Sequence, residues 1–210
     1  NEYLVVMSFN VVIPARLKSS RLKEKVLIEI HGIPMVIHVA QRASLSGAKN
    51  IVIATDDKKI VQVASHYNFK SVMTNKNHLS GTDRCLEASD INMWADQDII
   101  VNVQADEPLI DPALIDLVAK NVTESESGYV TACSEFKSYK EFINPNNVKV
   151  VLDNHSHALY FSRSSIPYSS SKDLSHNNYA FHHLGIYAYR IKTLKKFCSF
   201  SISDLERIER

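Results

Sequence analysis

Short apolar runs alternate with helical patterns over the first 122 residues of this 210-residue chain. The apolar runs are typical of buried strands, whereas the segments between them place apolar residues on one face of a helix. Strands that alternate with helices of about 10–15 residues predict βαβ units, and therefore an α/β fold with a mostly parallel sheet. The expected strands are residues 9–13, 51–55, 70–74 and 98–103, and the expected helices are residues 34–46, 60–67, 82–94 and 112–122.

Local signals mark the ends of two of these helices. Pro34 is expected to open the first helix, because its fixed φ suits the first turn, and Gly47 lies where a glycine usually follows a helix. Asp111 is expected to cap the fourth helix and Pro112 to start it.

The second half of the chain has a different character, with β-rich runs and a polar loop rich in serine and asparagine. We expect this half to add mixed strands to the sheet edge as a dimerisation or sugar-binding subregion. One domain is therefore predicted over residues 7–210. Met7 resembles a natural start, so residues 1–6 are expected to be an N-terminal extension. The predicted strands are residues 129–136, 148–152, 158–162 and 181–189, and the loop is 164–178.

Composition excludes several classes of protein. A hydrophobic content of 45% is enough for a full core, and a net charge of +1 gives no global field for nucleic acid. Cys85, Cys133 and Cys198 are far apart and form no CxxC pair, so neither a disulfide framework nor a cysteine zinc site is expected. No apolar run approaches the roughly 20 residues of a membrane span, and no signal peptide is apparent. Reduced thiols then favour a cytoplasmic protein.

A cluster of cations follows the first predicted strand. Five cations and one acid, Glu24, lie within residues 16–25. Ligands of open α/β sheets bind where strands end, and arginine and lysine suit a polyphosphate there. The alternative is a solvated surface loop. The five cations are Arg16, Lys18, Arg21, Lys23 and Lys25.

An acidic pair, Asp106 and Glu107, comes soon after the strand at 98–103. A carboxylate at this end of a strand can hold Mg²⁺, which would bridge phosphate oxygens beside the basic loop. The alternative is an ordinary turn, since Asp, Glu and Pro all favour strand exits.

Three weaker patterns each have a structural alternative. The segment 80–84 opens a helix whose free N–H groups suit a ligand, or it is simply a capped helix. His183 and Tyr187 share one face of a strand, which suits a polar pocket or a buried histidine. His155 and His157 lie in a predicted hairpin turn, which opposes a metal site there.

Together these motifs resemble the family of 3-deoxy-manno-octulosonate (Kdo) cytidylyltransferases, within the sugar nucleotidyltransferases. The resemblance covers residues 11–210. It implies a three-layer, Rossmann-like nucleotide-diphospho-sugar transferase fold and a homodimer that needs Mg²⁺. It also implies a cytoplasmic enzyme that joins CTP to Kdo, giving CMP-Kdo and pyrophosphate for lipopolysaccharide biosynthesis. The motifs are VVIPARLKSSRLKEK, IVIATDD, HLSGTDR, IIVNVQADEPLI, NPNNVKVVLD, ALYFSRSSIPY and HHLGIYAYR.

The resemblance also implies roles for particular residues. The expected catalytic residues are Arg16, Lys25 and Asp106, and Asp106 would hold Mg²⁺. Arg163 suits an acidic sugar, because a guanidinium pairs with a carboxylate through two hydrogen bonds, unless Arg163 pairs with an acid such as Asp153. The expected nucleotide-binding residues are Ala15, Arg16, Arg21, Lys25, Ser80, Gly81, Thr82, Arg84 and Gln104. The expected sugar-binding residues are Gln104, Arg163, His183 and Tyr187.

Three features depart from the family pattern. Glu24 stands where the family's phosphate loop has a glycine, so positive φ is less accessible and a negative charge faces the phosphates. Ala105 replaces the glycine of a Gln-Gly-Asp motif, and its methyl group fits only if φ is negative. The family's second metal-binding aspartate is expected in a segment beyond Arg210, which this sequence lacks.

The predicted reaction is attack of the anomeric hydroxyl of Kdo on the α-phosphorus of CTP, with pyrophosphate leaving. The protein would contribute positioning and charge neutralisation. One alternative is a cytidylyltransferase for another acidic sugar, such as a sialic acid. Another is a non-catalytic nucleotide or sugar binder, and a nucleic-acid-binding module is opposed by the neutral charge.

Overall fold

The computed structural model describes residues 8–17, 24–168 and 180–209. The chain divides into two compact units. The first unit comprises the chain up to Val130 together with Ile186–Phe200, and the second comprises Thr131–Gly185 together with the chain from Ser201. The predicted extension 1–6 lies outside the described residues, and a single domain over 7–210 stays a prediction.

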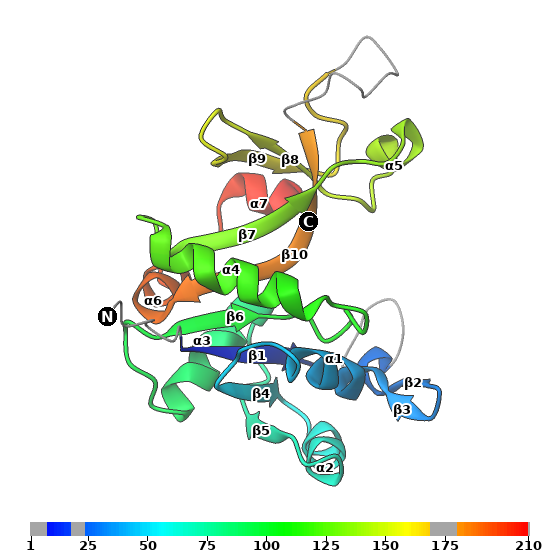
Figure 1. Cartoon of the computed structure of the whole chain (residues 1–210), viewed down its shortest axis with the longest axis vertical. Coiled ribbons are helices and arrows are strands. Elements are labelled where there is room, and N and C mark those ends of the chain that lie inside the picture. Colours follow the sequence, from blue (N-terminus) through cyan, green and yellow to red (C-terminus); the bar gives the residue numbers. More distant parts are fainter. Residues whose placement is uncertain (1–7, 18–23, 169–179, 210) are drawn as a thin grey trace, which may run out of the picture. The chain divides into compact units, whose positions relative to one another are not determined.

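The first unit is built on four parallel strands in the order β5-β4-β1-β6 (Figure 1). After β1, the chain adds β4 and β5 on one side and β6 on the other, which is the strand order of a Rossmann half. The end of β10 (Ala180–Arg190) then pairs with β6 in the antiparallel direction. The four parallel strands are β1 (Phe9–Ala15), β4 (Asn50–Thr55), β5 (Lys70–Met73) and β6 (Ile99–Asn102).

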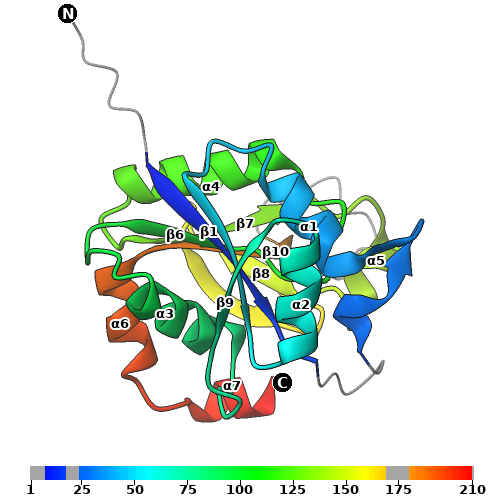
Figure 2. The ribbon, with the colours of Figure 1, turned by 90° about the horizontal axis from the view of Figure 1, so that it is seen from below.

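Helices cover both faces of these strands, so the first unit has three layers. Figure 2 shows α1 and α4 on one side of β1, with α3 and α6 on the other. All seven residues of β1 are buried, as expected of a strand covered on both faces. The helices of this unit are α1 (Met35–Ala43), α2 (Lys58–His66), α3 (Gly81–Ile91), α4 (Pro112–Glu124) and α6 (Ile191–Cys198). The predicted α/β fold is therefore confirmed.

Helix ends follow the sequence signals in one case and depart from them in another. Asp111 caps α4 by accepting a hydrogen bond from the Ala113 N–H at 3.0 Å, and Pro112 is the first helical residue, as predicted. By contrast, α1 ends at Ala43, so Gly47 does not follow the helix directly. The Gly47 N–H instead donates to Oδ1 of Asp116 on α4 at 2.8 Å.

A short hairpin precedes α1 and was not predicted. It joins β2 (Glu29–Ile30) to β3 (Ile33–Pro34). The two turn residues, His31 and Gly32, both have positive φ (51° and 77°), as a tight two-residue hairpin turn requires.

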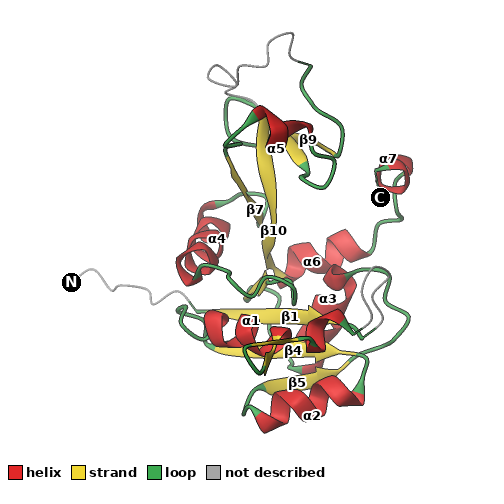
Figure 3. Cartoon of the chain, turned by 90° about the vertical axis from the view of Figure 1, so that its right-hand side faces the viewer, coloured by secondary structure: helices red, strands yellow, loops and turns green. Residues whose placement is uncertain are grey.

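The second unit is an antiparallel sheet with two short helices (Figure 3). The first residues of β10 pair with β8, β7 also pairs with β10, and β8 pairs with β9. The four strands predicted in this half of the chain are all present. They are β7 (Tyr129–Ser134), which begins in the first unit, β8 (Lys149–Leu152), β9 (Ala158–Ser162) and β10. The short helices α5 (Tyr139–Ile143) and α7 (Asp204–Ile208) were not predicted.

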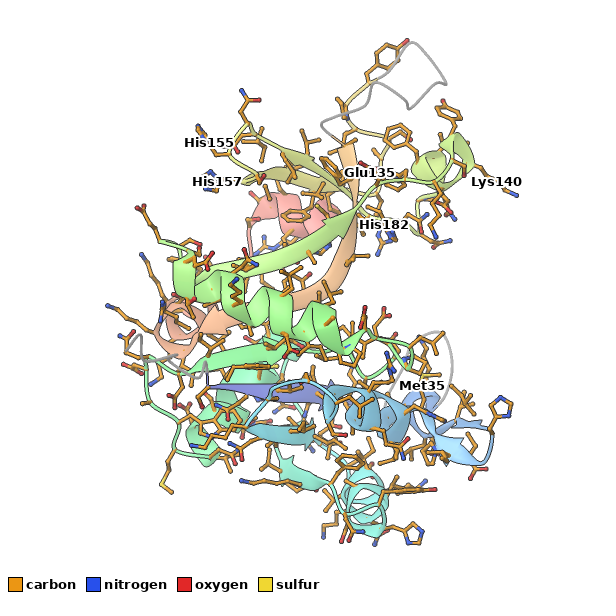
Figure 4. All side chains as sticks on the ribbon, in the orientation of Figure 1. Met35, Glu135, Lys140, His155, His157 and His182 are labelled. Atoms are coloured by element: carbon orange, nitrogen blue, oxygen red, sulfur yellow. The ribbon has the colours of Figure 1, made fainter. Side chains whose placement is uncertain are left out.

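Two findings concern membrane spans and metal sites, and both hold for the described residues only. No helix within them is both long and apolar enough to span a membrane. His155 and His157 lie on the turn between β8 and β9 (Figure 4), where both N–H groups donate to Oδ1 of Asp153 at 2.8 Å. No group of three or more histidine, cysteine or acidic residues suited to a metal occurs in the part of the chain that the structure describes.

Candidate functional site

In the first unit, parallel strands β1 and β6 end side by side, at the place where an open α/β sheet is expected to form a ligand crevice (the β1–β6 crevice). The strand order changes direction between these two strands, and open α/β sheets bind ligands at that point. Ala15, the last residue of β1, is fully buried, and Arg16 directly after it is exposed. Gln104 and Asp106 follow β6 on the same edge. These four residues, named from the sequence, therefore lie at or after the carboxyl ends of two neighbouring parallel strands.

Lys25 and Asp106 form an ion pair at this edge. Nζ of Lys25 lies 2.6 Å from Oδ2 of Asp106, although the residues are 81 positions apart. Their side chains are 37% and 44% exposed, so a ligand can reach both groups. The structure thus joins the predicted phosphate-binding loop to the predicted metal-binding carboxylate. Arg21, with Lys18 and Lys23, lies outside the described residues.

A second carboxylate, Glu107, adds to the negative charge beside this pair. Desolvation, and then the charge of Asp106, raise the pKa of Glu107, while the ammonium of Lys25 opposes the rise. The adjacent carboxylates of Asp106 and Glu107 offer hard oxygen donors, and the ammonium group of Lys25 already pairs with Asp106. This donor set fits Mg²⁺, which typically binds one or two carboxylates and completes its shell with water and substrate phosphates.

Glu24 adopts the left-handed conformation in which a glycine would be unstrained. Its φ is 54° and its ψ is 30°, a conformation that costs a residue with a side chain about 1 kcal/mol. The Glu24 carboxylate accepts from Nζ of Lys59 at 3.1 Å. Ala105 is buried and is not among the described residues with positive φ, so its methyl group meets the condition set from the sequence.

Gly81 lets the start of α3 approach the crevice closely. A Cβ at this position would lie 3.1 Å from Cγ of Pro14 and 3.8 Å from Oε1 of Gln104. The first contact is tighter than side chains ordinarily tolerate, so the absence of a side chain matters here for space. As a result, the end of β1, Gln104 after β6 and the N-terminus of α3 meet at one place. Contact of these residues with a nucleotide stays a prediction.

Ser80 and Arg84 make contacts within the protein, which favours the alternative that residues 80–84 are simply the start of a capped helix. The Ser80 hydroxyl accepts from the Asp83 N–H at 3.1 Å, and the Ser80 N–H donates to Oδ2 of Asp83 at 3.1 Å, which forms a capping box. Arg84 is only 3% exposed and donates to Oγ1 of Thr74 and, at 3.3 Å, to Oδ2 of Asp56. Oδ1 of Asp56 is buried and has no hydrogen-bond partner among the described residues. Contact of Ser80 or Arg84 with a nucleotide stays a prediction.

A polar network lies beside Gln104 on one face of the sheet. Gln104 donates to Oδ1 of Asn102 at 3.1 Å, and Asn102 donates to the Tyr189 hydroxyl at 3.4 Å. Thr82 also hydrogen-bonds Tyr189, and Tyr187 stacks on Tyr189 with ring centroids 6.3 Å apart. Burial raises the pKa of both tyrosines, so their hydroxyl groups are neutral donors.

Sequence reasoning missed Asn102 and Tyr189, although each left a signal. Asn102 is a polar residue inside the most apolar central strand, and Tyr189 lies two positions after Tyr187, on the same strand face. Thr74 and Asp56 were also missed, although Thr74 ends the predicted strand 70–74 and Asp56 directly follows the predicted strand 51–55.

The other two predicted sugar-binding residues, Arg163 and His183, belong to the second unit. Arg163 donates from Nη1 to the carbonyl of Pro145 at 3.0 Å and does not pair with Asp153. Both polar groups of the Arg163 backbone are hydrogen-bonded. The carbonyl accepts from Nζ of Lys149 at 2.7 Å, and the N–H donates to Oε2 of Glu209 at 3.0 Å. The guanidinium is therefore anchored through a single carbonyl and keeps further donors for an anion.

His183 is a partly buried, neutral histidine. A hydrogen bond of 2.9 Å joins its Nε2 to Oγ1 of Thr131, and its ring meets Phe161 edge-to-face at 4.8 Å. Burial, and then the neighbouring His182, lower the pKa of His183 to about 4. At neutral pH it therefore offers hydrogen bonds without a charge.

The strand order and the three layers of the first unit make this an α/β nucleotidyltransferase fold. The chain belongs to the cytidylyltransferase family, whose family model matches residues 10–210.

Its relatives include 3-deoxy-manno-octulosonate cytidylyltransferases of Proteus mirabilis and Nitratiruptor. The first is 43% identical over 205 residues (96% of this chain, 81% of the relative), and the second is 47% identical over 203 residues (95% and 83%). A solved structure of CMP:2-keto-3-deoxy-manno-octonic acid synthetase complexed with CTP matches with a TM-score of 0.86 at 37% identity, covering 96% of this chain and 81% of that one. A cytidylyltransferase from Leptospira borgpetersenii, at 19% identity and a TM-score of 0.60, covers 96% and 67% and shares the fold.

Proposed function

We propose that this protein transfers CMP from CTP to Kdo, giving CMP-Kdo and pyrophosphate. The observation that carries the proposal is the pairing of Lys25 with Asp106 at the β1–β6 crevice of a cytidylyltransferase fold. The names of relatives at 43–47% identity, and the CTP complex of the matching structure, support CTP and Kdo as the substrates.

The first unit would bind and orient the triphosphate. Arg16 and Lys25, with Arg21, would neutralise the phosphate oxygens, so that the α-phosphorus is exposed to attack in line with the leaving pyrophosphate. The backbone N–H groups at the start of α3 would lie against the nucleotide, since Gly81 brings them to the end of β1. Asp106, with Glu107 beside it, would hold Mg²⁺, which supplies charge stabilisation for the phosphates when it is bound.

Binding of the acidic sugar is assigned to Gln104, Arg163, His183 and Tyr187. Arg163 would pair with the Kdo carboxylate, because its guanidinium has donors left after the contact with Pro145. His183 and Tyr187 would donate or accept hydrogen bonds as neutral groups, in agreement with their shifted pKa values.

We further propose a homodimer that works in the cytoplasm and supplies lipopolysaccharide biosynthesis. The Kdo in the names of the relatives supports the lipopolysaccharide role. Free thiols at Cys85, Cys133 and Cys198 fit a reducing compartment. Sedimentation analysis of the purified protein tests the dimer.

A pyrophosphate-release assay with CTP, Kdo and Mg²⁺ tests the proposed reaction. We expect release that requires all three components, and a much lower rate when a sialic acid replaces Kdo. A faster rate with sialic acid would favour the other acidic sugar. Calorimetric binding of CTP with no pyrophosphate release under any of these conditions would contradict catalysis.

A further inference from the structure

The ammonium group of Lys25 binds Asp106, the carboxylate that the proposed function assigns to Mg²⁺. Its Nζ lies 2.6 Å from Oδ2 of Asp106, the distance of a strong charge-assisted hydrogen bond. A divalent cation that binds this oxygen would lie close to the ammonium and be repelled by it. In the free protein, the cation bound to Asp106 is therefore the ammonium group of Lys25.

The pair is arranged so that it can open. Both side chains are more than a third exposed, and exposed ion pairs contribute little stability because water and salt screen them. Lysine carries its charge on a flexible four-carbon stem, so the ammonium can move to another anion without moving the backbone. A triphosphate at the crevice offers several anionic oxygens in place of one carboxylate.

The backbone beneath Lys25 is held in place. The Leu27 N–H donates to the Glu24 carbonyl at 2.8 Å, and the Ile28 N–H donates to the Lys25 carbonyl at 3.2 Å. The next side chain, Val26, is buried. These contacts keep the lysine stem at the crevice, so movement of the ammonium is confined to its reach around Asp106.

We propose that Lys25 fills the metal position of the free protein and leaves it when a nucleoside triphosphate binds, so that divalent metal binding at Asp106 depends on nucleotide. The proposal rests on the proposed function, because it concerns the same carboxylate and the same phosphates. It makes Lys25 a residue that selects metal bound with nucleotide over free metal. Lys25 also neutralises the acidic pair: without it, Asp106 and Glu107 would present two adjacent negative charges to any cation in solution.

Binding of Mn²⁺ to the protein alone, followed by electron paramagnetic resonance, tests this role without measuring activity. We expect weak Mn²⁺ binding by the wild type and binding at least about tenfold tighter by Lys25→Met, because a repelling charge has been removed. The gain should disappear in the Lys25→Met/Asp106→Asn double variant. Lys25→Arg should behave as the wild type, since it keeps a cation beside the carboxylate.

Lys59→Met is the matched control. Lys59 pairs with Glu24, next to Lys25, but has no contact with Asp106 in the described structure. Its loss should leave Mn²⁺ binding unchanged. Thermal unfolding of each variant verifies that the fold is intact. Equal Mn²⁺ affinities of the wild type and Lys25→Met, without nucleotide, would overturn the proposal.

A second arm separates this proposal from the proposed function. With α,β-methylene-CTP, a non-hydrolysable analogue, the wild type should gain Mn²⁺ binding that Asp106→Asn abolishes. Binding with the analogue that does not depend on Asp106 would overturn the metal role of Asp106 and the lysine's role together. Binding that depends on Asp106, with no effect of any Lys25 variant on the protein alone, would overturn the role of Lys25 only.

Discussion

Lys25 of the first unit and Lys149 of the second unit each bind oxygen atoms through the ammonium group, but in opposite surroundings. Lys25 is partly exposed and pairs with a single carboxylate. Lys149 is fully buried and donates to three backbone carbonyls, those of Asn144, Asn147 and Arg163, at 2.7–2.9 Å. Burial, and then the charge of Arg163, lower the pKa of Lys149.

The positive charge of Lys25 is therefore available to a ligand, whereas that of Lys149 stabilises the structure. All three donors of Lys149 are used on backbone carbonyls, so its ammonium is not available to a ligand. Lys25 has donors and solvent access left. Binding of anionic substrates is therefore expected from Lys25, whereas Lys149 holds the strand ends that position the backbone of Arg163.

The largest expected effect is on stability, at Lys149. Lys149→Met should lower the free energy of unfolding by about 3–5 kcal/mol, because three backbone carbonyls lose a charged donor. Lys25→Met should lower it by no more than about 1 kcal/mol, because its ion pair is exposed. Urea unfolding of the two variants measures both values. Similar losses in the two variants would break the comparison.

The next effect is on turnover, at Asp106. Asp106→Asn should reduce the rate of pyrophosphate release by at least about a hundredfold, because a hard cation loses an anionic ligand. Its urea unfolding curve should match the wild type closely, since the pair with Lys25 contributes little stability. Near wild-type turnover at saturating Mg²⁺ would remove the metal role from this residue.

A change in sugar binding is expected at Arg163. Arg163→Ala should raise the KM for Kdo by about tenfold to a hundredfold and leave CTP binding nearly unchanged, because the carboxylate loses a charged partner. A Kdo analogue without the carboxylate should be a poor substrate of the wild type and lose little more in the variant. Equal losses for Kdo and the analogue would assign Arg163 to structure, in the manner of Lys149.

A smaller effect concerns pH and His183. The pKa of His183 is about 4 in the folded protein and near 6.5 in an unfolded chain, so the unfolded state binds the proton first as the pH falls. The stabilisation is present above pH 6.5 and is lost progressively toward pH 4. After allowance for its partial exposure, we expect this residue to contribute about 1–2 kcal/mol to the loss. Unfolding of His183→Asn should depend less on pH over this window, whereas His155→Asn, on the exposed turn, should match the wild type.

The smallest effect is expected at Glu24. Glu24→Gly should raise the free energy of unfolding by up to about 1 kcal/mol, because glycine adopts positive φ without strain. It should also tighten CTP binding by removing a like charge from the phosphates. Glu24→Ala removes the same charge but keeps the strained backbone, so calorimetry and unfolding of the two variants separate the two causes. Unchanged values in both variants would mean that neither cause acts here.

Much of the first unit was predictable because its signals are local. The apolar run before Arg16, the periodic helix at Ile60 and Ala64, and the Asp111–Pro112 helix start each depend on neighbouring residues alone, and the structure has all three. The hairpin before α1 was missed because β2 and β3 are only two residues each, too short for a periodic pattern. The short helices α5 and α7 escaped for the same reason.

The sequence by itself determined which residue types stand at the strand ends, and hence that cations follow β1 and acids follow β6. Tertiary structure alone decided which of these charges meet. It pairs Lys25 with Asp106, buries Arg84 against Thr74 and Asp56, and encloses Lys149 among carbonyls from two segments. The physical reason is that a charge takes its role from the distance and exposure of its partners, and these partners come from segments that are brought together only when the sheets assemble.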